Sequence, residues 1–398
     1  MRKDIESMNI WYDCIRMPLP QLLSFIVDNR GKTVPLSDNG SIQLIATNCI
    51  RNENLYPSYE KIRFLSKETY QNWFRAHPIP GDILFVCKGT PGRVCMVPDP
   101  IDFCIAQDMI ALRCNESKIY NKYLLAVLRS TVIQNQIANT SVGDVIPHFK
   151  KQFLDQLMIP VPPMSLQHLI GDVYYSFSKK AELNKQINDN LQEQAKAIYQ
   201  HIVVENADAS WTSGVLSDIA VITMGQSPKG ESYNEEGIGT VFFQGRAEFG
   251  FRFPTRRLFT TDPKRMALAN DALMSVRAPV GDMNVAYEDC CIGRGLGSIR
   301  SKDGHQSFVF YTMLALREQL NVFNGEGTVF GSINRDALNS MPVDIPPKEI
   351  MDQFEDLVAP MDVSIRNNYD EICRLQTMRD SLLPKLMSGE IDVSAITL

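Results

Sequence analysis

Long apolar runs are absent from this sequence of 398 residues. No run approaches the ~18 residues that a membrane-spanning helix needs, and the N-terminus MRKDIESMNIWYD lacks the apolar core of a signal peptide. We therefore expect a cytoplasmic protein. Because 44 % of the residues are hydrophobic, the chain can still bury sizeable cores, and a typical size of about 100–200 residues per domain predicts two to four domains.

Closely spaced metal ligands are also missing. The nine cysteines include no Cys-x-x-Cys pair, and those in the first half lie within apolar runs, which favours small core residues in a reducing compartment over a zinc site. The five histidines are scattered, with no partner at ligand spacing. The sequence therefore predicts no metal and no cofactor in this chain.

Two glycine motifs resemble nucleotide-binding loops only in part. Gly31-Lys32-Thr33 has Ile26 where a phosphate-binding loop needs a glycine. The run GRGLG at 293–297 is followed by no helix-forming segment, so we interpret it as a loop that lets the backbone approach another segment closely. Asp99, Glu116 and Lys118 fit a metal-dependent nuclease signature by letter, but they lie in turns without a counterpart in the second half.

A strong basic balance, which is typical of simple nucleic-acid-binding proteins, is absent as well. The net charge is −6, but the acidic excess is uneven along the chain. Residues 347–398 hold 10 acidic and 5 basic residues, whereas residues 1–163 hold 15 and 18. An acidic C-terminal segment is suited to contact with protein, and the first half remains suited to contact with phosphates.

What the sequence does contain is a pair of long helical patterns. Apolar residues recur at helical spacing in two segments, and each segment follows a Pro-Pro pair that ends a strand-like run. Neither apolar stripe can be buried alone, so we predict that the two helices pair as a coiled coil. The packing residues predicted for this pair are Ile170, Phe177, Ile187, Leu191, Ile198, Met361, Ile365, Ile372, Leu375 and Leu382.

Proline at position 360 interrupts the second pattern. In a regular helix proline costs about 3 kcal/mol. We therefore predict a kink or a break near Ala359.

The segments before the two helices repeat each other. GDILFVCKGTPGRV at 81–94 matches NDALMSVRAPVGDM at 270–283, and CIAQDMIALR at 104–113 matches CIGRGLGSIR at 291–300. Alternating apolar runs with Gly and Asn turns predict strands, and each half then has one predicted helix, at Tyr120–Asn139 and about Ser307–Asn321.

The expected fold is therefore α+β, with two similar mixed α/β domains and two long antiparallel helices in a pseudo-twofold repeat. The boundaries predicted are 1–163 and 207–346 for the domains, and 164–206 and 347–398 for the helices. About 40 helical residues span roughly 60 Å. Such helices can set a distance between two binding sites.

Basic and amide side chains on predicted loops are the candidates for binding DNA. Arg and Gln can bond bidentately to guanine and adenine, while Lys and Arg neutralise phosphates. Lys88 and Arg277 align in the repeat, each after a strand and before a Gly/Pro loop. The full candidate set is Arg51, Lys88, Thr90, Arg93 and Gln107 in the first half, and Gln244, Arg246, Arg256, Arg277 and Arg294 in the second.

The sequence resembles the specificity subunit of type I restriction–modification systems over its whole length. RDSLLPKLMSGEI at 379–391 resembles the end of many such subunits, and NDNLQEQAKAIYQHI at 188–202 resembles the end of their central helix. GDILFVCKGTPGRV, VRAPVGDMNVA, CCIGRGLGSIR and INRDALNSMPVDIPP are similar to pieces of their target recognition domains.

The resemblance implies that each domain recognises one half of a bipartite, asymmetric double-stranded DNA target. The helices would fix the spacer and dock two modification subunits, which bind S-adenosylmethionine and methylate adenine. Restriction subunits that use ATP and Mg²⁺ would join them, in the cytoplasm of a bacterium or archaeon. This chain would itself be non-catalytic.

Two alternatives remain open at this stage. One is a nuclease that uses Asp99, Glu116 and Lys118, and the other is a protein scaffold that no longer recognises DNA. Cleavage by the purified chain would favour the first. DNA binding unchanged by the joint replacement of Lys88 and Arg277 would favour the second.

Overall fold

The computed structural model describes residues 9–29, 31, 33–60, 62–141, 147–208, 211–325 and 331–391. Two compact units divide the chain: unit 1 comprises Met1–Gln186 and Asn368–Leu398, and unit 2 comprises Ile187–Asn367. The divisions fall inside the two long helices, so each unit contains one globular domain and a segment of each helix. The boundaries predicted from the sequence instead separate the helices from the domains.

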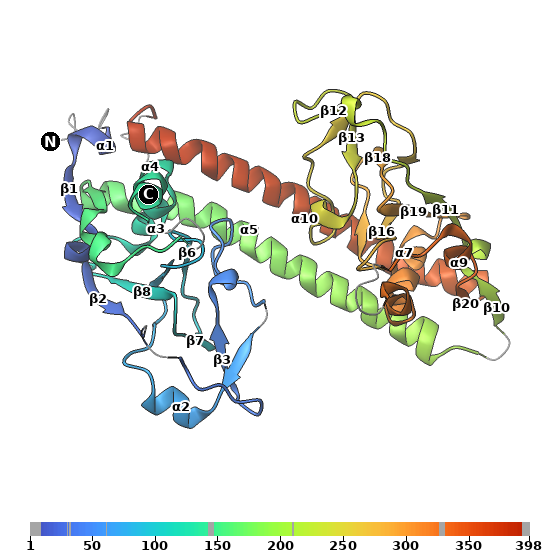
Figure 1. Ribbon diagram of the computed structural model, residues 1–398, viewed down its shortest axis with the longest axis horizontal. Coiled ribbons are helices and arrows are strands. Elements are labelled where there is room, and N and C mark those ends of the chain that lie inside the picture. The colour runs from blue at the N-terminus through green and yellow to red at the C-terminus, as the bar shows by residue number, and fades with distance from the viewer. Residues whose placement is uncertain are drawn as a thin grey trace. The chain divides into compact units, whose positions relative to one another are not determined.

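Unit 1 contains three small sheets (Figure 1). The strands β1 (Ile15–Pro18) and β9 (Met158–Val161) pair antiparallel. A four-stranded antiparallel sheet has the order β2 (Leu23–Val27), β8 (Met109–Cys114), β5 (Ile83–Val86), β6 (Val94–Met96). The third sheet has the order β4 (Arg63–Leu65), β3 (Ile42–Ile45), β7 (Phe103–Ile105), with β3 and β7 parallel. Short helical elements are α1 (Ile10–Asp13), η1 (Leu19–Leu22), η2 (Thr47–Cys49), α2 (Lys67–Asn72) and η3 (Lys151–Gln156).

Unit 2 repeats this topology. The pair β10 (Thr212–Val215) and β20 (Pro342–Ile345) corresponds to β1 and β9, and the sheet β11 (Ala220–Met224), β19 (Leu296–Ser301), β16 (Ala272–Ser275), β17 (Met283–Val285) corresponds to β2-β8-β5-β6. In the third sheet β13 (Thr240–Phe243) and β18 (Cys290–Ile292) are parallel, as β3 and β7 are. The remaining elements are β12 (Tyr233–Asn234), β14 (Phe259–Thr260), β15 (Met266–Ala267), α6 (Leu216–Ile219), η5 (Gly230–Ser232), η6 (Arg246–Glu248), η7 (Val322–Asn324) and α9 (Arg335–Asn339). The predicted internal repeat and α+β fold are confirmed.

The strand β5 shows why its apolar run is continuous. All four of its residues are buried. Ile83 and Phe85 face a core that contains helical residues such as Leu124, whereas Leu84 and Val86 face a second core shared with the parallel strands. Because successive side chains of a strand point to opposite faces, a strand covered on both sides needs apolar residues throughout.

The helix that follows the central strands is broken in both units. The single helix predicted at Tyr120–Asn139 is wrong, because α3 (Asn121–Arg129) ends before Ser130 and α4 (Thr131–Thr140) begins after it. The Ser130 hydroxyl accepts a hydrogen bond from the Ile133 amide at 3.4 Å, so this serine caps the second helix. In unit 2 the single helix predicted at about Ser307–Asn321 is also divided, into α7 (Gln306–Ala315) and α8 (Arg317–Asn321).

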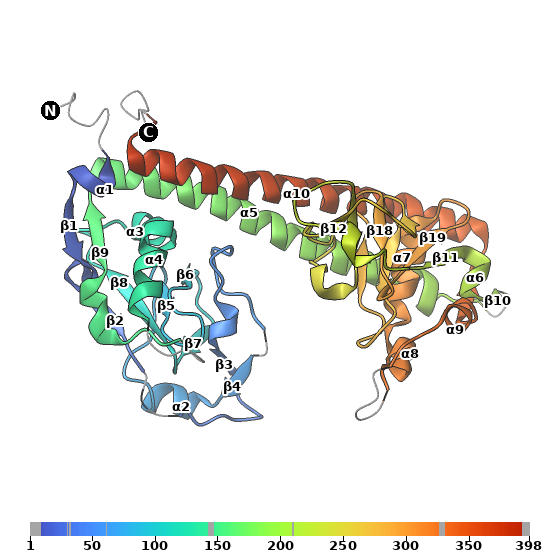
Figure 2. The same cartoon turned by 45° about the horizontal axis from the view of Figure 1, so that its top comes forward.

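The long helices are α5 (Met164–Tyr199), which continues into the π-helical turn η4 (Gln200–Glu205), and α10 (Lys348–Ser388). Within unit 1 the end of α10 runs beside the start of α5 in both views (Figures 1 and 2), and the Asn184 amide donates to the Glu371 carboxylate at 2.6 Å. Within unit 2 the rings of Tyr199 and Phe354 lie 5.6 Å apart. The helices are therefore paired antiparallel in each unit, as predicted.

Nine of the ten predicted packing residues are buried or partly buried, and one is exposed. Ile170, Ile365 and Ile372 are buried, and Phe177, Leu191, Ile198, Met361, Leu375 and Leu382 are partly buried. Ile187, by contrast, is 45 % exposed.

Asparagines take the inward positions around Ile187. Asn184 and Asn188 are 1 % and 3 % exposed, and the Asn188 amide donates to the Ile365 carbonyl at 3.3 Å. Because each amide finds a partner on the facing helix, polar residues are tolerated there and the apolar pattern is misleading.

Pro360 does not break α10, so of the kink or break predicted near Ala359 the break is wrong. The helix is continuous from Lys348 to Ser388. Pro360 is exposed, so water can satisfy the carbonyl that loses its amide partner. Phe354 and Val358 before the proline and Ile365 after it are fully buried, which keeps both turns in place.

Candidate nucleic-acid interface

Four of the predicted DNA-binding residues line one cavity of about 370 Å³ in unit 2. They are Gln244, Arg246, Arg277 and Arg294. We call this cavity the arginine pocket. Its other lining residues are Ser227, Gly245, Ala247, Glu248, Arg257, Ser275, Ala278 and Gly295.

The parallel strands bring these residues together. Gln244 follows β13 and Arg294 follows β18, and the two strands pair with Phe243 opposite Ile292. The carboxyl ends of parallel strands meet at one edge of a sheet. The loop after β16 joins the same edge, because the Val276 amide donates to the Gly295 carbonyl at 3.0 Å.

Glycines make this convergence possible. A Cβ atom at Gly293 would lie 2.8 Å from the Gln244 Cα, and one at Gly295 would lie 2.7 Å from the Gln244 carbonyl oxygen. Both distances are shorter than side chains tolerate. The prediction that GRGLG permits a close backbone approach is confirmed.

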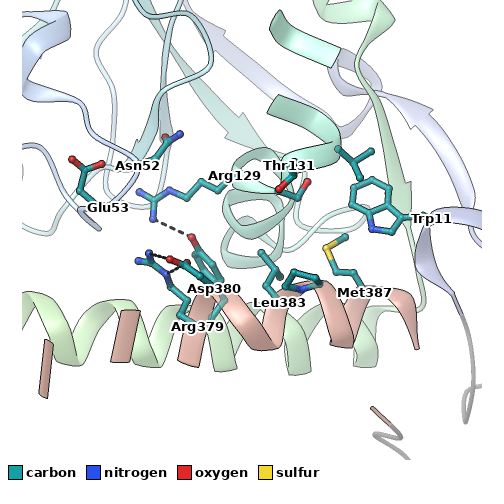
Figure 3. A pocket seen from close by; sticks show the side chains of 13 residues that line it. Trp11, Asn52, Glu53, Arg129, Thr131, Arg379, Asp380, Leu383 and Met387 are labelled. Carbon is teal, nitrogen blue, oxygen red and sulfur yellow. Dashed lines mark hydrogen bonds and ion pairs between the residues drawn. The ribbon is translucent and has the colours of Figure 1, made fainter. Parts of the chain in front are cut away.

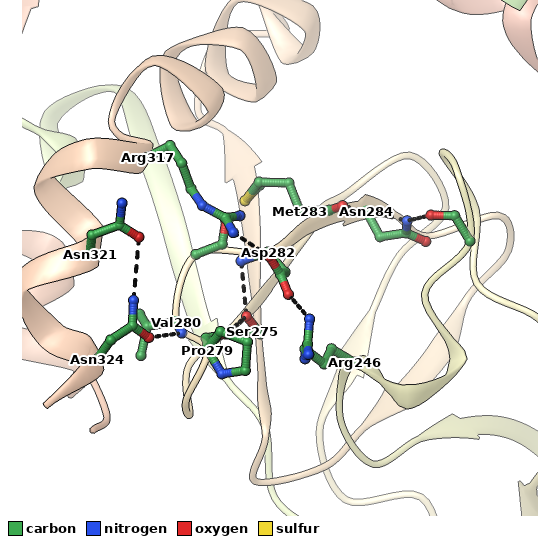
Figure 4. Close-up of polar contacts among 12 residues, drawn as sticks. Arg246, Ser275, Pro279, Val280, Asp282, Met283, Asn284, Arg317, Asn321 and Asn324 are labelled. Atoms are coloured by element: carbon green, nitrogen blue, oxygen red, sulfur yellow. Dashed lines mark hydrogen bonds and ion pairs between the residues drawn. The ribbon is translucent and has the colours of Figure 1, made fainter. Parts of the chain in front are cut away.

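The arginines of unit 2 differ in their partners. Arg246 pairs with Asp282 (Figure 4), and Arg256, outside the pocket, pairs with Glu288 at 2.5 Å. Arg277 and Arg294 are exposed, and their side chains have no ion pair or hydrogen bond within the described residues.

Arg257 is paired as well. Its guanidinium lies 2.8 Å from Glu248 and 3.2 Å from Glu235. The hydrogen bond and negative charge of Glu248 raise the pKa of Arg257 above its ordinary value. The pocket thus contains two compensated arginines and two uncompensated ones.

In unit 1 the counterpart of Arg277 is Lys88. Lys88 forms an isolated antiparallel bridge with His148, and Arg277 forms one with Ser332. The Lys88 amide also donates at 3.2 Å to the carbonyl of Asp108, the neighbour of Gln107. Lys88 and Gln107 therefore correspond to Arg277 and Arg294, as the aligned repeats predicted.

The other unit 1 candidates are more dispersed. Thr90 is exposed and Arg93 partly buried on the loop after Lys88. Gln107 donates to the Thr33 hydroxyl at 3.2 Å. Arg51 pairs with Glu60 at 2.5 Å, which compensates its charge.

Sequence reasoning missed the residues that hold the pocket loops. Asp282, Ser275 and Arg317 form a network around the loop after β16 (Figure 4). Their only sequence signal is that Asp282 aligns with Arg93, a change from a basic to an acidic residue between the repeats.

The family comparison decides the identity of the chain. The model of the type I restriction modification DNA specificity domain matches residues 27–193 and again residues 209–359.

The chain belongs to the family of type I restriction–modification specificity subunits.

Similar proteins agree with this assignment. The MjaX specificity subunit of Methanocaldococcus jannaschii, named as part of a type I restriction enzyme, is 30 % identical over 340 residues, which cover 79 % of each chain. The MjaIX specificity subunit of the same organism is 20 % identical over 375 residues, 86 % of this chain and 85 % of that one. The crystal structure of a type I system S subunit from M. genitalium has the same fold, with a TM-score of 0.60 and 14 % identity over 93 % of this chain and 95 % of that one.

The nuclease alternative for this specificity subunit has no geometric support. Glu116 lines a cavity with Asp82 and Arg113, and Asp99 is not among its lining residues. The Lys118 ammonium donates to the Gln21 carbonyl at 2.9 Å. Across the parts of the chain that the structure describes, no group of His, Cys, Asp or Glu could hold a metal ion, and none of the helices there could span a membrane.

A further cavity of the specificity subunit, of about 360 Å³, lies within unit 1 where α1, the α3–α4 junction and α10 meet (Figure 3). Arg129 donates to the carbonyls of Asn54 and Val94 at 2.5 and 2.8 Å. Arg379 pairs with Asp380 and lies 5.4 Å from the centre of the Tyr174 ring. Arg129 is used in holding the backbone of unit 1 and Arg379 in packing α10 against Tyr174, so the cavity is unlike the arginine pocket.

Proposed function

We propose that each recognition domain binds one half of a bipartite double-stranded DNA target. The observation that carries the proposal is the arginine pocket, where loops from three separate strands bring Gln244, Arg246, Arg277 and Arg294 to one cavity. Guanidinium and amide groups are the side chains best suited to base edges in the major groove.

The two kinds of arginine suit two kinds of contact. Arg277 and Arg294 are exposed and unpaired among the described residues, so each can neutralise a phosphate. Local positive charge of this kind offsets the acidic residues counted over the whole domain.

The two halves of the target should differ. Unit 1 has Lys88 and Gln107 where unit 2 has Arg277 and Arg294. Lysine acts as a compact point charge and arginine as a planar fork, while glutamine pairs bidentately with adenine. Different side chains on the same frame favour an asymmetric target.

The long helices would set the spacer and dock the modification subunits. Exposed apolar side chains occur on both helices: Leu183 and Ile187 on α5, and Leu357, Val363 and Met378 on α10. Together with the acidic excess of residues 347–398, they favour protein contacts over DNA contacts.

In this proposal, methylation and cleavage of DNA are carried out by the partner subunits. S-adenosylmethionine would bind to two modification subunits, and ATP and Mg²⁺ would bind to restriction subunits. The chain itself would be non-catalytic and would act in the cytoplasm of a bacterium or archaeon.

Joint replacement of Arg277 and Arg294 by alanine tests the proposal. In the complex with modification subunits, affinity for the cognate duplex should fall, because two phosphate contacts are lost. The slope of log affinity against log salt should fall by about 2. Binding is measured by fluorescence anisotropy between low and physiological salt.

Lys196→Ala is the control, because it removes a positive charge, paired with Glu193, from α5 rather than from a recognition domain. Its affinity and slope should equal those of the unmodified chain. If the double variant also matches the unmodified chain, the scaffold alternative is supported and the proposal fails.

A further inference from the structure

Arg246 differs from the unpaired Arg277 and Arg294 because it has an acidic partner, Asp282, that is itself fixed in place. We infer that Arg246 recognises a guanine in the half-target of unit 2, and that Asp282 is the positioning residue that orients its guanidinium. This inference rests on the proposed function and names the base that the pocket selects.

Both carboxylate oxygens of Asp282 are bound by arginine side chains (Figure 4). One carboxylate oxygen pairs with Arg246, and the other lies 2.5 Å from the Arg317 guanidinium on α8. The carboxylate is only 20 % exposed. A carboxylate that is bound through both oxygens favours a single orientation of the Arg246 guanidinium.

The backbone around Asp282 is fixed as well. Its amide donates to the Ser275 hydroxyl at 2.9 Å, and its carbonyl accepts from the Ser275 amide at 2.9 Å. Ser275 is 1 % exposed at the end of β16. The orientation of Asp282 is therefore set by a buried strand.

The loop is also tied to the following helices. Arg317 donates to the Gly281 carbonyl at 2.6 Å, and the Val280 amide donates to the Asn324 side chain at 2.6 Å (Figure 4). Gly281 has a φ of +88°, and a Cβ there would lie 3.0 Å from the Leu320 Cβ. These contacts restrict movement of the loop that carries Asp282.

Arg246 combines this support with access to the pocket. Its side chain is 50 % exposed, and its ion pair with Asp282 uses Nη1. The remaining guanidinium donors are available to a ligand. A planar fork that is already oriented loses less entropy on binding than the unsupported side chains of Arg277 and Arg294.

The chemistry of such a fork selects guanine. In the major groove guanine presents two neighbouring acceptors, O6 and N7, and arginine bonds to both. Adenine presents one acceptor beside a donor, which repels a second guanidinium N–H. A fixed arginine therefore discriminates between the two purines, whereas a mobile one can turn towards a phosphate.

Unit 1 lacks this arrangement. The residue three positions after the parallel strand is Asn48 in unit 1 and Arg246 in unit 2, and Arg93 stands where unit 2 has Asp282. The Asn48 amide donates to the Glu60 carbonyl at 3.1 Å. The guanine should therefore belong to the half-target bound by unit 2.

The test is selection from a random duplex library by the full chain with its modification subunits. The unmodified chain should return a bipartite motif with an invariant guanine in the half assigned to unit 2. With Arg246→Ala that one position should become degenerate while the rest of the motif persists. Affinity for the guanine-containing duplex should fall roughly 5- to 150-fold.

Replacing the guanine with 7-deazaguanine, which lacks the N7 acceptor, separates base contact from a structural role. The analogue should weaken binding by the unmodified chain and leave Arg246→Ala unaffected. Asp282→Asn should relax the guanine position in part. Glu288→Gln, which neutralises the exposed partner of Arg256, should leave it invariant.

The outcomes distinguish the inference from the proposed function. If Arg246→Ala weakens binding to all sequences equally, or keeps its sensitivity to 7-deazaguanine, Arg246 does not recognise the guanine and the inference fails alone. If the unmodified complex selects no motif, the proposed function fails first.

Discussion

Phe354→Ala should lower the free energy of unfolding of unit 2 by about 3–5 kcal/mol. The Phe354 ring is fully buried, and its centroid lies 5.6, 6.1 and 6.0 Å from the rings of Tyr199, Phe308 and Tyr311. These rings come from α5 and α7, so Phe354 joins both helices to α10. Truncation removes the aromatic contacts and leaves a cavity between three elements.

Tryptophan fluorescence can report on unit 2 alone. Trp211 is the only tryptophan of unit 2 and packs against its core, so a background with Trp11→Phe and Trp73→Phe isolates its signal. Urea unfolding of the full chain then gives the cost of each variant. Leu357 lies three residues after Phe354 on α10 and is 46 % exposed. Leu357→Ala should therefore lower the free energy of unfolding by no more than about 0.5 kcal/mol. Equal costs for the two variants would contradict this packing.

Deleting one heptad from both long helices should shorten the spacer of the DNA target. Asn184 contacts Glu371 and Asn188 contacts Ile365, so residues 184–190 and 365–371 form a matched pair of heptads. Each heptad contributes about 10 Å of helix, which equals about three base pairs of DNA. Methylation at the original motif should be lost and should appear at a motif with a shorter spacer.

Methylome sequencing of cells that express the variant with its modification subunits measures this change. Deleting the heptad from α5 alone is the control, because it puts the two helices out of register and should abolish methylation at both motifs. An unchanged spacer in the paired deletion would mean that the helices do not set the distance.

The internal repeat was predictable because the features that reveal it are local in the sequence. The central strands are apolar throughout, and the Gly/Pro loops follow them at matching positions. Both features follow from burial on two faces and from turn chemistry, which depend on neighbouring residues. The aligned positions of Lys88 and Arg277 could be found for the same reason.

The errors in the helices have tertiary causes. Ile187 fits the apolar spacing, but Asn188 takes the inward position because the facing Ile365 carbonyl accepts its amide. Pro360 does not end α10, because buried residues hold the turns on both sides. In each case the deciding contact lies more than a hundred residues away or in the core, where a pattern along the chain gives no information.

The residue types of the candidate site were predictable from the sequence, but the ion pairs that these residues form were not. The candidate arginines look alike in the sequence, but the structure divides them by their partners: Arg246, Arg256 and Arg51 are paired with acidic residues, while Arg277 and Arg294 have no such partner among the described residues. The distant pairing of Arg246 with Asp282 cannot be read from spacing. That pairing is what separates a fixed base contact from a mobile phosphate contact.

Exchange of one recognition domain tests the central claim most directly. Residues 207–346 are replaced by the corresponding domain of a specificity subunit with a different known target, and the methylome is sequenced in the presence of the modification subunits. One half of the bipartite motif should change to that of the donor, while the other half and the spacer stay the same. A motif that changes in both halves, or in neither, would contradict two independent recognition domains on one pair of helices.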